Sequence, residues 1–156
     1  MSAILDVQGV SKRFGGLTAV KNVSFTLQPG ELTGILGPNG AGKTTLFNLL
    51  TGFIAADSGS IRFEGQELRG LAPYKIVNRG VARTFQLTRP FLGMTVLENV
   101  VVACLSPRAR DAQDKETRAQ QLLDQVGLGA KASDAVETLP YGDLRRLEIA
   151  RALATK

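Results

Sequence analysis

The sequence of 156 residues predicts an α/β domain with an inserted helical subdomain. Three observations support this class. Strand-like segments occur within the first 63 residues, and a glycine-rich loop with an amphipathic helix after it lies among them. Mostly helical patterns follow from Thr95 onward. We place the boundary after residue 93, with a β region and loop-containing core in residues 1–93 and a helical subdomain in residues 94–156.

The expected strands have short apolar patterns bounded by turn residues. Apolar residues alternate strictly with polar ones over residues 23–27, the pattern of a half-buried strand. Two more short strands are expected at Leu5-x-Val7 and Ile61-x-Phe63. Residues 32–36 form an apolar run that reads as a buried strand. Together these segments predict mixed strands that feed a parallel core.

The expected helices show apolar residues at helical spacing. Leu46, Leu49, Leu50 and Phe53 predict one apolar stripe on a helix from Lys43 to about Thr51. Thr95-x-x-Glu98 predicts a capping box at a helix start. The other expected helices are Pro73 to Arg79, Ala112 to Val126, and Leu144 to Ala154 with Leu147, Ala150 and Leu153 or Ala154 facing inward.

The composition excludes several classes of function. Apolar residues make up 44% and charged residues 21%, as in an ordinary soluble globular protein. No apolar run is long enough to span a membrane, and the N-terminus does not resemble a signal peptide. The absence of histidine rules out catalysis by serine–histidine or cysteine–histidine pairs within the chain. The lone Cys104 is expected to be buried and inert. The net charge of +5 suggests anionic partners, and the scattered basic residues argue against nucleic acid.

The strongest motif is the segment from Gly37 to Thr44, which matches G-x-x-x-x-G-K-[ST] at every fixed position. Its glycines let backbone N–H groups converge on phosphate oxygens, and the helix that follows directs its positive end to the same anion. Lys43 can reach the β- and γ-phosphates, and the Thr44 hydroxyl can coordinate Mg²⁺. A glycine-rich turn needed only for folding is the weaker alternative, because an expected strand precedes the motif and an expected helix follows it.

Other segments carry a family resemblance that covers the chain from about Leu5 to Lys156. Residues 37–45 have the form of the phosphate loop typical of ABC ATPases. Residues 12–15, with the strand-like segment after them, resemble the N-terminal β region of that family. Leu139-Pro-Tyr-Gly-Asp143 and the helix after it resemble the family's signature motif. The resemblance implies a P-loop core with an N-terminal antiparallel β region and an inserted helical subdomain that carries the signature.

Within the family, residues 80–86 and the Leu139-Pro-Tyr-Gly stretch are most similar to the ATP-binding subunits of branched-chain amino-acid importers. This implies an enzyme subunit that powers import by binding and hydrolysing ATP. Two alternatives stay open: an inactive nucleotide-binding fragment, or an ABC ATPase for another cargo such as urea or a lipid-linked substrate. The family's Walker B aspartate and catalytic glutamate lie beyond the signature helix. We therefore expect no catalytic residue, and no hydrolysis, from these 156 residues alone.

The resemblance assigns roles to individual residues. It implies that Phe14 stacks on adenine, unless it is a core aromatic, and that Gln86 helps to hold Mg²⁺, unless it is a strand-end polar residue. Pro140, Tyr141 and Gly142 would face the nucleotide of a second subunit, although Pro140 and Tyr141 replace the usual serine and glycine. The expected nucleotide contacts are Phe14, Gly37, Pro38, Asn39, Gly40, Ala41, Gly42, Lys43, Thr44, Thr45, Gln86, Tyr141 and Gly142, with Thr44 and Gln86 also contacting the metal.

The resemblance further implies ATP and Mg²⁺ as cofactors. The expected partners are transmembrane permease subunits, a second ATP-binding subunit in a homo- or heterodimer and, indirectly, a periplasmic binding protein. Residues 86–98 would contact the permease. The expected location is the cytoplasmic face of the plasma membrane, with the protein bound peripherally.

Overall fold

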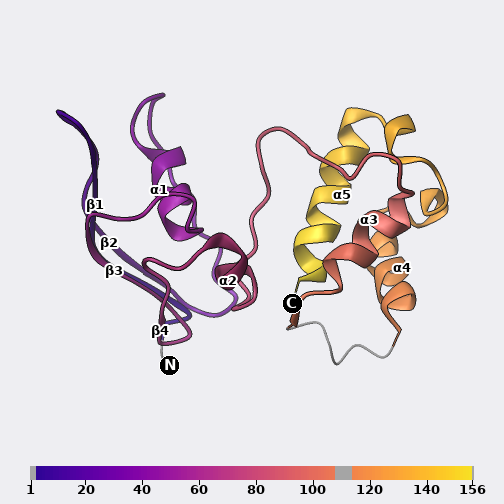
Figure 1. The fold of residues 1–156 in the computed structure, drawn as a ribbon, viewed down its shortest axis with the longest axis horizontal. Helices are drawn as coiled ribbons and strands as arrows, with labels where there is room; N and C mark the ends of the chain where they lie inside the picture. The colour runs from indigo at the N-terminus through magenta and orange to yellow at the C-terminus, as the bar shows by residue number, and fades with distance from the viewer. Residues whose placement is uncertain (1–2, 108–113, 156) are drawn as a thin grey trace. The chain divides into compact units, whose positions relative to one another are not determined.

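The computed structural model describes residues 3–107 and 114–155, which form two compact units, Met1–Val81 and Ala82–Lys156 (Figure 1). Each unit has its own hydrophobic core, and each is treated separately below. The division falls at Val81, earlier than the boundary after residue 93 that the sequence suggested. Residues 82–93 belong with the helical unit because hydrogen bonds from its last helix hold them.

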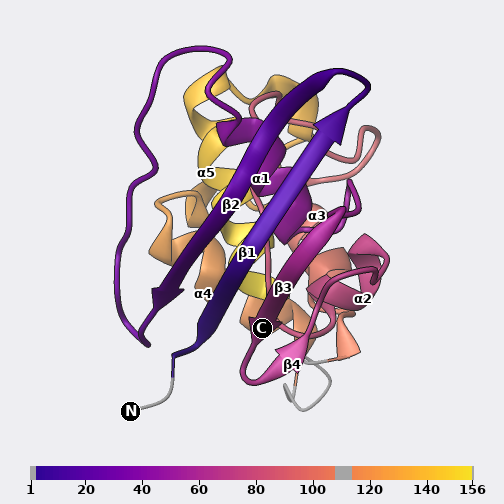
Figure 2. The same ribbon diagram turned by 90° about the vertical axis from the view of Figure 1, so that its left-hand side faces the viewer.

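The first unit is built on a four-stranded antiparallel sheet in the order β2-β1-β3-β4 (Figure 2). The strands are β1 (Leu5–Phe14), β2 (Leu17–Leu27), β3 (Ser58–Phe63) and β4 (Gln66–Glu67). All three predicted strands in this sheet are confirmed, but β1 and β2 are longer than expected. They form a hairpin in which Phe14 pairs with Leu17.

Two helices pack on one face of this sheet (Figure 1). Helix α1 (Lys43–Leu50) buries Leu46, Leu49 and Leu50, and α2 (Pro73–Val77) buries Ile76. These side chains share a cluster with apolar residues of β1, β2 and β3. The predicted stripe was wrong at its last member: Phe53 lies beyond the end of α1 and is half exposed.

A glycine allows close contact between β3 and β1. In β1, residues 9 and 10 lie between the pairs Gln8–Ser60 and Ser11–Ser58, so two residues oppose Gly59 alone. A Cβ atom built on Gly59 would lie 2.6 Å from atoms of the β1 backbone. This is a β-bulge, which bends the strand and fixes local pairing.

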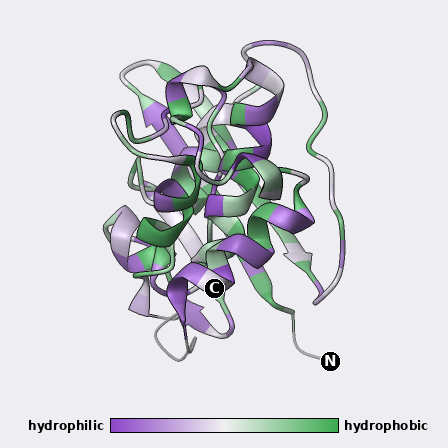
Figure 3. Cartoon of the chain, turned by 90° about the vertical axis from the view of Figure 1, so that its right-hand side faces the viewer, coloured by the Kyte–Doolittle hydropathy of each residue, from purple (hydrophilic) through white to green (hydrophobic). Residues whose placement is uncertain are grey.

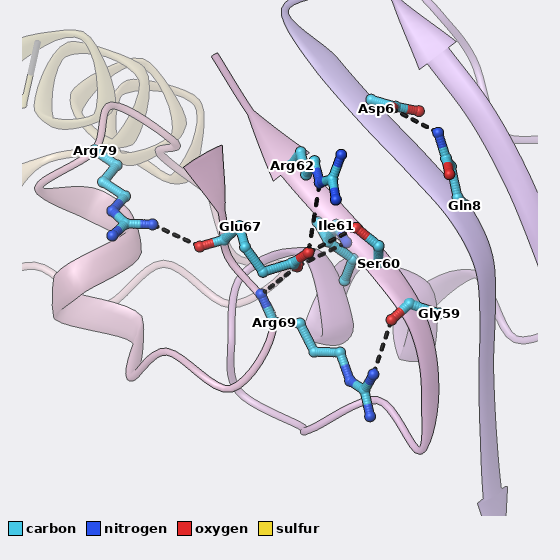
Figure 4. A network of polar contacts seen from close by, with 9 residues as sticks. All are labelled: Asp6, Gln8, Gly59, Ser60, Ile61, Arg62, Glu67, Arg69 and Arg79. Carbon is cyan, nitrogen blue, oxygen red and sulfur yellow. Dashed lines mark hydrogen bonds and ion pairs between the residues drawn. The ribbon is translucent and has the colours of Figure 1, made fainter. Parts of the chain in front are cut away.

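The carboxylate of Glu67 holds the far edge of the sheet together (Figure 4). It accepts hydrogen bonds from the Ser60 hydroxyl at 2.6 Å and from the N–H groups of Ile61 and Arg69 at 2.9 and 3.0 Å. Burial acts to raise the pKa of Glu67, but these hydrogen bonds outweigh it and lower the pKa below its usual value. The Glu67 carbonyl also accepts from Arg79 at 2.6 Å, which fastens the end of α2 to β4.

The expected buried strand at residues 32–36 is not present. The chain from Glu31 to Pro38 has no regular secondary structure and is drawn as a loop between β2 and α1 (Figure 2). Leu32 and Leu36 are 98% and 95% exposed. A strand needs a neighbour for its N–H and C=O groups, and the sheet of the described residues ends at β2 and β4. The expected parallel core is likewise absent from the described residues, because every strand pair there is antiparallel.

The second unit is helical. Helices α3 (Val96–Ala103), α4 (Lys115–Gln125) and α5 (Tyr141–Ala154) surround one apolar cluster, with 3₁₀ turns at Gly129–Lys131 and Val136–Thr138. Apolar and polar residues are mixed along these helices, as expected of amphipathic segments (Figure 3). Among the residues that the structure describes, no helix is long and apolar enough to cross a membrane.

Helix ends in this unit follow the predicted capping chemistry with two changes. Thr95 and Glu98 form the predicted capping box. The expected helix at 112–126 begins at Lys115 after an Asp114 cap, and residues 112 and 113 lie outside the described residues. Helix α5 begins at Tyr141 rather than Leu144, directly after Pro140, which has an extended backbone at the N-cap.

Two further predictions for this unit are confirmed. Leu147, Ala150 and Ala154 are buried on α5, as the sequence predicted. Cys104 is also fully buried, and burial raises the pKa of its thiol, so it has the unreactive setting expected from the sequence.

Candidate nucleotide-binding site

The glycine-rich loop owes its shape to two left-handed glycines. Gly40 and Gly42 have φ angles of 82° and 84°. The Ala41 N–H donates to the Pro38 carbonyl at 3.2 Å, which closes a turn from Pro38 to Ala41 that contains Gly40. A Cβ atom on Gly42 would lie 2.2 Å from the Ala19 carbonyl oxygen of β2, closer than any real side chain can approach. Glycine is therefore required at position 42, where the loop lies directly against the sheet.

Helix α1 begins at the end of this loop and presents free amide groups. Gly42 is its N-cap, so no side chain caps the helix, and its first turn has no acidic residue. The first intrahelical bond runs from the Leu46 N–H to the Gly42 carbonyl at 2.8 Å. The N–H groups of Lys43, Thr44 and Thr45 therefore have no acceptor within the helix. This combination of free donors, a positive helix end and a first turn without acidic residues suits a bound anion.

The Lys43 side chain folds back over the loop. Its ammonium donates to the carbonyl oxygens of Gly37 and Pro38, each at 2.6 Å. Two hydrogen bonds to uncharged carbonyls leave the positive charge uncompensated, so a phosphate oxygen would be a stronger partner for it. The Thr44 side chain beside it belongs to an exposed residue, whereas Thr45 is half-buried. Thr44 is thus the accessible hydroxyl of the pair.

Phe14 lies at the end of β1 and is not a core aromatic. The residue is 46% exposed and belongs to neither apolar cluster, so the core alternative is wrong. The Lys12 ammonium lies 5.5 Å from the centre of its ring. That ammonium in turn contacts Asp57 at 2.7 Å, and Asp57 also accepts from the Arg13 N–H at 2.8 Å. The hydrogen bond from Lys12, followed by that from Arg13, lowers the pKa of the Asp57 carboxyl.

Gln86 lies in the second unit, in a segment without regular structure. Because no strand is present there, the alternative of a strand-end residue is wrong. The residue is exposed, and its backbone carbonyl accepts a hydrogen bond from Arg145 of α5. The same guanidinium donates to the Phe85 carbonyl. The segment is therefore fixed through its backbone, and the glutamine side chain is not used to anchor it.

The signature segment forms the start of α5. Tyr141 is the first helical residue and is exposed, and a Cβ atom on Gly142 would meet nothing within 4 Å. The carboxylate of Asp143 is mostly buried and pairs with Lys131 at 2.6 Å and with Arg146 at 3.5 Å. These two cations offset the negative charge in the first turn, which would otherwise oppose an anion at the helix start.

The structure thus brings the predicted residues together in two groups. The P-loop residues and Phe14 belong to the first unit, whereas Gln86, Tyr141 and Gly142 belong to the second. Sequence reasoning missed the two groups that position them, Asp57 and Arg145. Asp57 carried no signal, since its partners are distant in sequence. Arg145 could have been found from its spacing, because it is four residues after Tyr141 and therefore on the same helix face.

Comparison with known proteins identifies the family. A protein-family model described as "ABC transporter" matches residues 20–156, which is most of the chain. The chain belongs to the ABC transporter family. Its antiparallel β region, P-loop helix and helical subdomain are those of an ATP-binding cassette, and the resemblance seen in the sequence is confirmed.

The curated relatives of this ABC cassette include transport proteins. It is 44% identical, over 98% of its length, to the high-affinity branched-chain amino acid transport ATP-binding protein LivG of Escherichia coli strain K12. It is 41% identical over the same share to BraF of Pseudomonas aeruginosa, which carries the same description. The chain spans 66% of the length of both relatives.

Solved structures show the same fold. The chain matches the ADP conformation of MJ1267, an ATP-binding cassette of an ABC transporter, with a TM-score of 0.86 and 32% identity. The match covers 99% of this chain and 66% of that one. The dimeric post-hydrolysis cassette MJ0796, bound to ADP and Pi, matches with a TM-score of 0.81 at 27% identity, over 97% of this chain and 69% of that one.

Proposed function

We propose that this chain is the ATP-binding part of a subunit that powers the import of branched-chain amino acids. The geometry of the P-loop carries the nucleotide assignment. Gly42 presses the loop against β2, the first amides of α1 have no acceptor, and the Lys43 ammonium lies over the loop with its charge uncompensated. Residues 37–45 then bind the phosphates, and Phe14 stacks on the base from its exposed position at the end of β1.

Magnesium fits this site as the ion that accompanies the phosphates. Mg²⁺ retains several waters and takes one or two protein oxygens together with phosphate oxygens. The exposed Thr44 hydroxyl is a suitable protein ligand at the start of α1. The side chain of Gln86 is the second proposed ligand, and its exposure and backbone anchoring are consistent with that role.

The signature segment supports pairing with a second ATP-binding subunit. Gly142 leaves the start of α5 sterically open, and the ion pairs of Asp143 offset its negative charge. A γ-phosphate from the partner subunit would meet N–H donors there, as in other anion sites at helix starts. The dimeric state of MJ0796 is consistent with this arrangement. ATP hydrolysis by such a dimer would be coupled to transmembrane permeases at the inner face of the plasma membrane, with a periplasmic binding protein delivering cargo.

The nucleotide assignment is tested by a charge-matched pair of variants. Lys43→Ala should weaken Mg·ATP binding at least tenfold, because a charge-assisted hydrogen bond to phosphate contributes about 1.5–3 kcal/mol. Lys21→Ala removes the same charge from an exposed position on β2 and should bind as the parent does. Isothermal titration calorimetry measures both. Equal affinities for the parent and Lys43→Ala would remove the assignment.

The cargo assignment rests on the identity to LivG and BraF. It is tested by uptake of radiolabelled leucine into proteoliposomes that contain the full-length protein with its permease and binding protein. Uptake that requires ATP and is competed by isoleucine and valine, but not by urea, is expected. Uptake of urea instead would show that the transporter carries another class of cargo.

A further inference from the structure

Arg145 of α5 contacts the segment that carries Gln86 and also the first residue of its own helix. Its guanidinium donates to the backbone carbonyls of Phe85 and Gln86. Its Nε and Nη2 atoms donate to the Tyr141 hydroxyl at 3.0 and 2.7 Å. The Glu148 carboxylate, which is 9% exposed, lies 3.3 Å from Nη1 and offsets the charge. One planar group therefore joins two parts of the chain that are nearly sixty residues apart.

A second attachment lies further along the same helix. Arg151 donates to the Arg89 carbonyl at 2.9 Å, and its guanidinium lies 4.4 Å from the centre of the Phe91 ring. The fully buried Asn99 of α3 accepts from the Phe91 N–H at 2.7 Å and donates to the Phe91 carbonyl at 3.1 Å. The later part of the segment is thus held independently of Arg145, so loss of Arg145 would loosen the stretch around Phe85 and Gln86 without detaching the whole segment.

We propose that Arg145 is a positioning residue that makes the Gln86 backbone and the Tyr141–Gly142 helix start move as one body. This inference rests on the proposed function, in which Gln86 reaches the metal and the helix start faces a phosphate. The tie uses backbone carbonyls, so it sets where the glutamine side chain begins and leaves its amide for the metal. A displacement of the Gln86 backbone then displaces the start of α5 with it.

The proposal depends on the shape of the guanidinium as well as on its charge. Arginine presents five donors in a fixed plane, whereas lysine presents a single point charge on a flexible stem. A lysine at position 145 could contact one carbonyl but could not bridge Phe85, Gln86 and the Tyr141 hydroxyl together. Arg145→Lys should therefore behave like Arg145→Ala. A residue needed only for its charge would be rescued by lysine.

The tie itself is tested by limited proteolysis of the chain without nucleotide. Chymotrypsin should cut after Phe85 and Leu87 about tenfold faster in Arg145→Ala and Arg145→Lys, because loss of charge-assisted hydrogen bonds frees the segment. Arg146→Lys, an equal change at an exposed position on the same helix, should be cut as the parent is. Tyr141→Phe removes one acceptor and should give an intermediate rate. Parent-like cutting of the Arg145 variants, with α5 intact by circular dichroism, would overturn the tie.

The positioning role is tested by the gain in ATP affinity that Mg²⁺ provides. Arg145→Lys should bind ATP in EDTA as tightly as the parent does, because the phosphate loop lies in the other unit. The increase in ATP affinity on adding Mg²⁺ should be several-fold smaller in this variant than in the parent. A full magnesium gain in a variant whose segment is released would overturn the positioning role. If the parent and Lys43→Ala bind ATP equally, the proposed function fails, whereas the proteolysis result still decides whether Arg145 ties the segment.

Discussion

Gly42→Ala should destabilise the first unit and weaken nucleotide binding together, because this glycine joins the phosphate loop to the sheet. Two costs arise at this position. A left-handed conformation costs an L-residue about 1–2 kcal/mol. The added Cβ atom would also lie 2.2 Å from the Ala19 carbonyl oxygen, so the loop or β2 must shift. Forcing extra volume into a packed site costs about 1–3 kcal/mol, giving roughly 2–5 kcal/mol in total.

Gly40→Ala is the matched control for this prediction. Gly40 has nearly the same φ angle, 82° against 84°, but a Cβ atom there would meet nothing within 4 Å. Its variant should lose only the conformational cost of about 1–2 kcal/mol. The difference between the two variants therefore isolates the contact with Ala19. Since both substitutions are glycine to alanine in one loop, their effects on the unfolded chain nearly cancel.

Urea unfolding measures the difference. The chain has two tyrosines, Tyr74 in the first unit and Tyr141 in the second, and no tryptophan. In a Tyr141→Phe background, tyrosine emission reports the first unit alone. We expect the Gly42→Ala midpoint to fall well below that of Gly40→Ala, with Mg·ATP affinity reduced in parallel. Equal midpoints for the two variants would refute the argument that close contact with β2 sets the position of the loop.

Three further predictions concern other exposed groups. Phe14→Ala should weaken ATP binding by about 1–3 kcal/mol while Phe14→Trp binds normally, on the scale of base–aromatic stacking, and calorimetry would show no loss if the ring does not stack. The Lys12 contact lowers the pKa of Asp57, so the stability that ionised Asp57 gives the fold is complete above the ordinary Asp pKa and is lost as pH falls through the lowered value. Asp57→Asn should therefore flatten the fall in melting temperature between pH 5 and 2 that thermal unfolding measures. Substitution of the exposed Leu87 or Phe91 should uncouple transport while sparing ATP binding, and cross-linking that never joins them to a permease would count against that role.

Local chemistry was predictable from the sequence. The capping box at Thr95 and Glu98 needs only residues three apart, and it formed as expected. The P-loop helix and the buried Leu46 and Leu49 likewise follow from short-range spacing. The family resemblance gave Phe14 the role of stacking on adenine, which spacing alone could not separate from a core aromatic, and the structure shows the ring partly exposed.

Features that depend on distant partners were not predictable. The apolar run at 32–36 has the composition of a buried strand, but a strand exists only where another strand pairs with it. The length of β1 was also missed, because its second half contains polar residues and is held by pairing with β2. The contact of Arg145 with Tyr141 follows from their spacing, but its contacts with the backbone carbonyls of Phe85 and Gln86 leave no trace in side-chain patterns.

The bulge opposite Gly59 affects how the sheet folds as well as its final shape. A strand that slips by two residues keeps the same side chains inward, so hydrophobic patterning alone permits such misalignments. A two-residue slip of β3 along β1 in either direction would bring Asp57 or Ile61 to the place of Gly59, where a Cβ atom would lie only 2.6 Å from backbone atoms of β1. Neither side chain fits there. Gly59 therefore disfavours the two nearest misaligned pairings of β3 with β1 during folding.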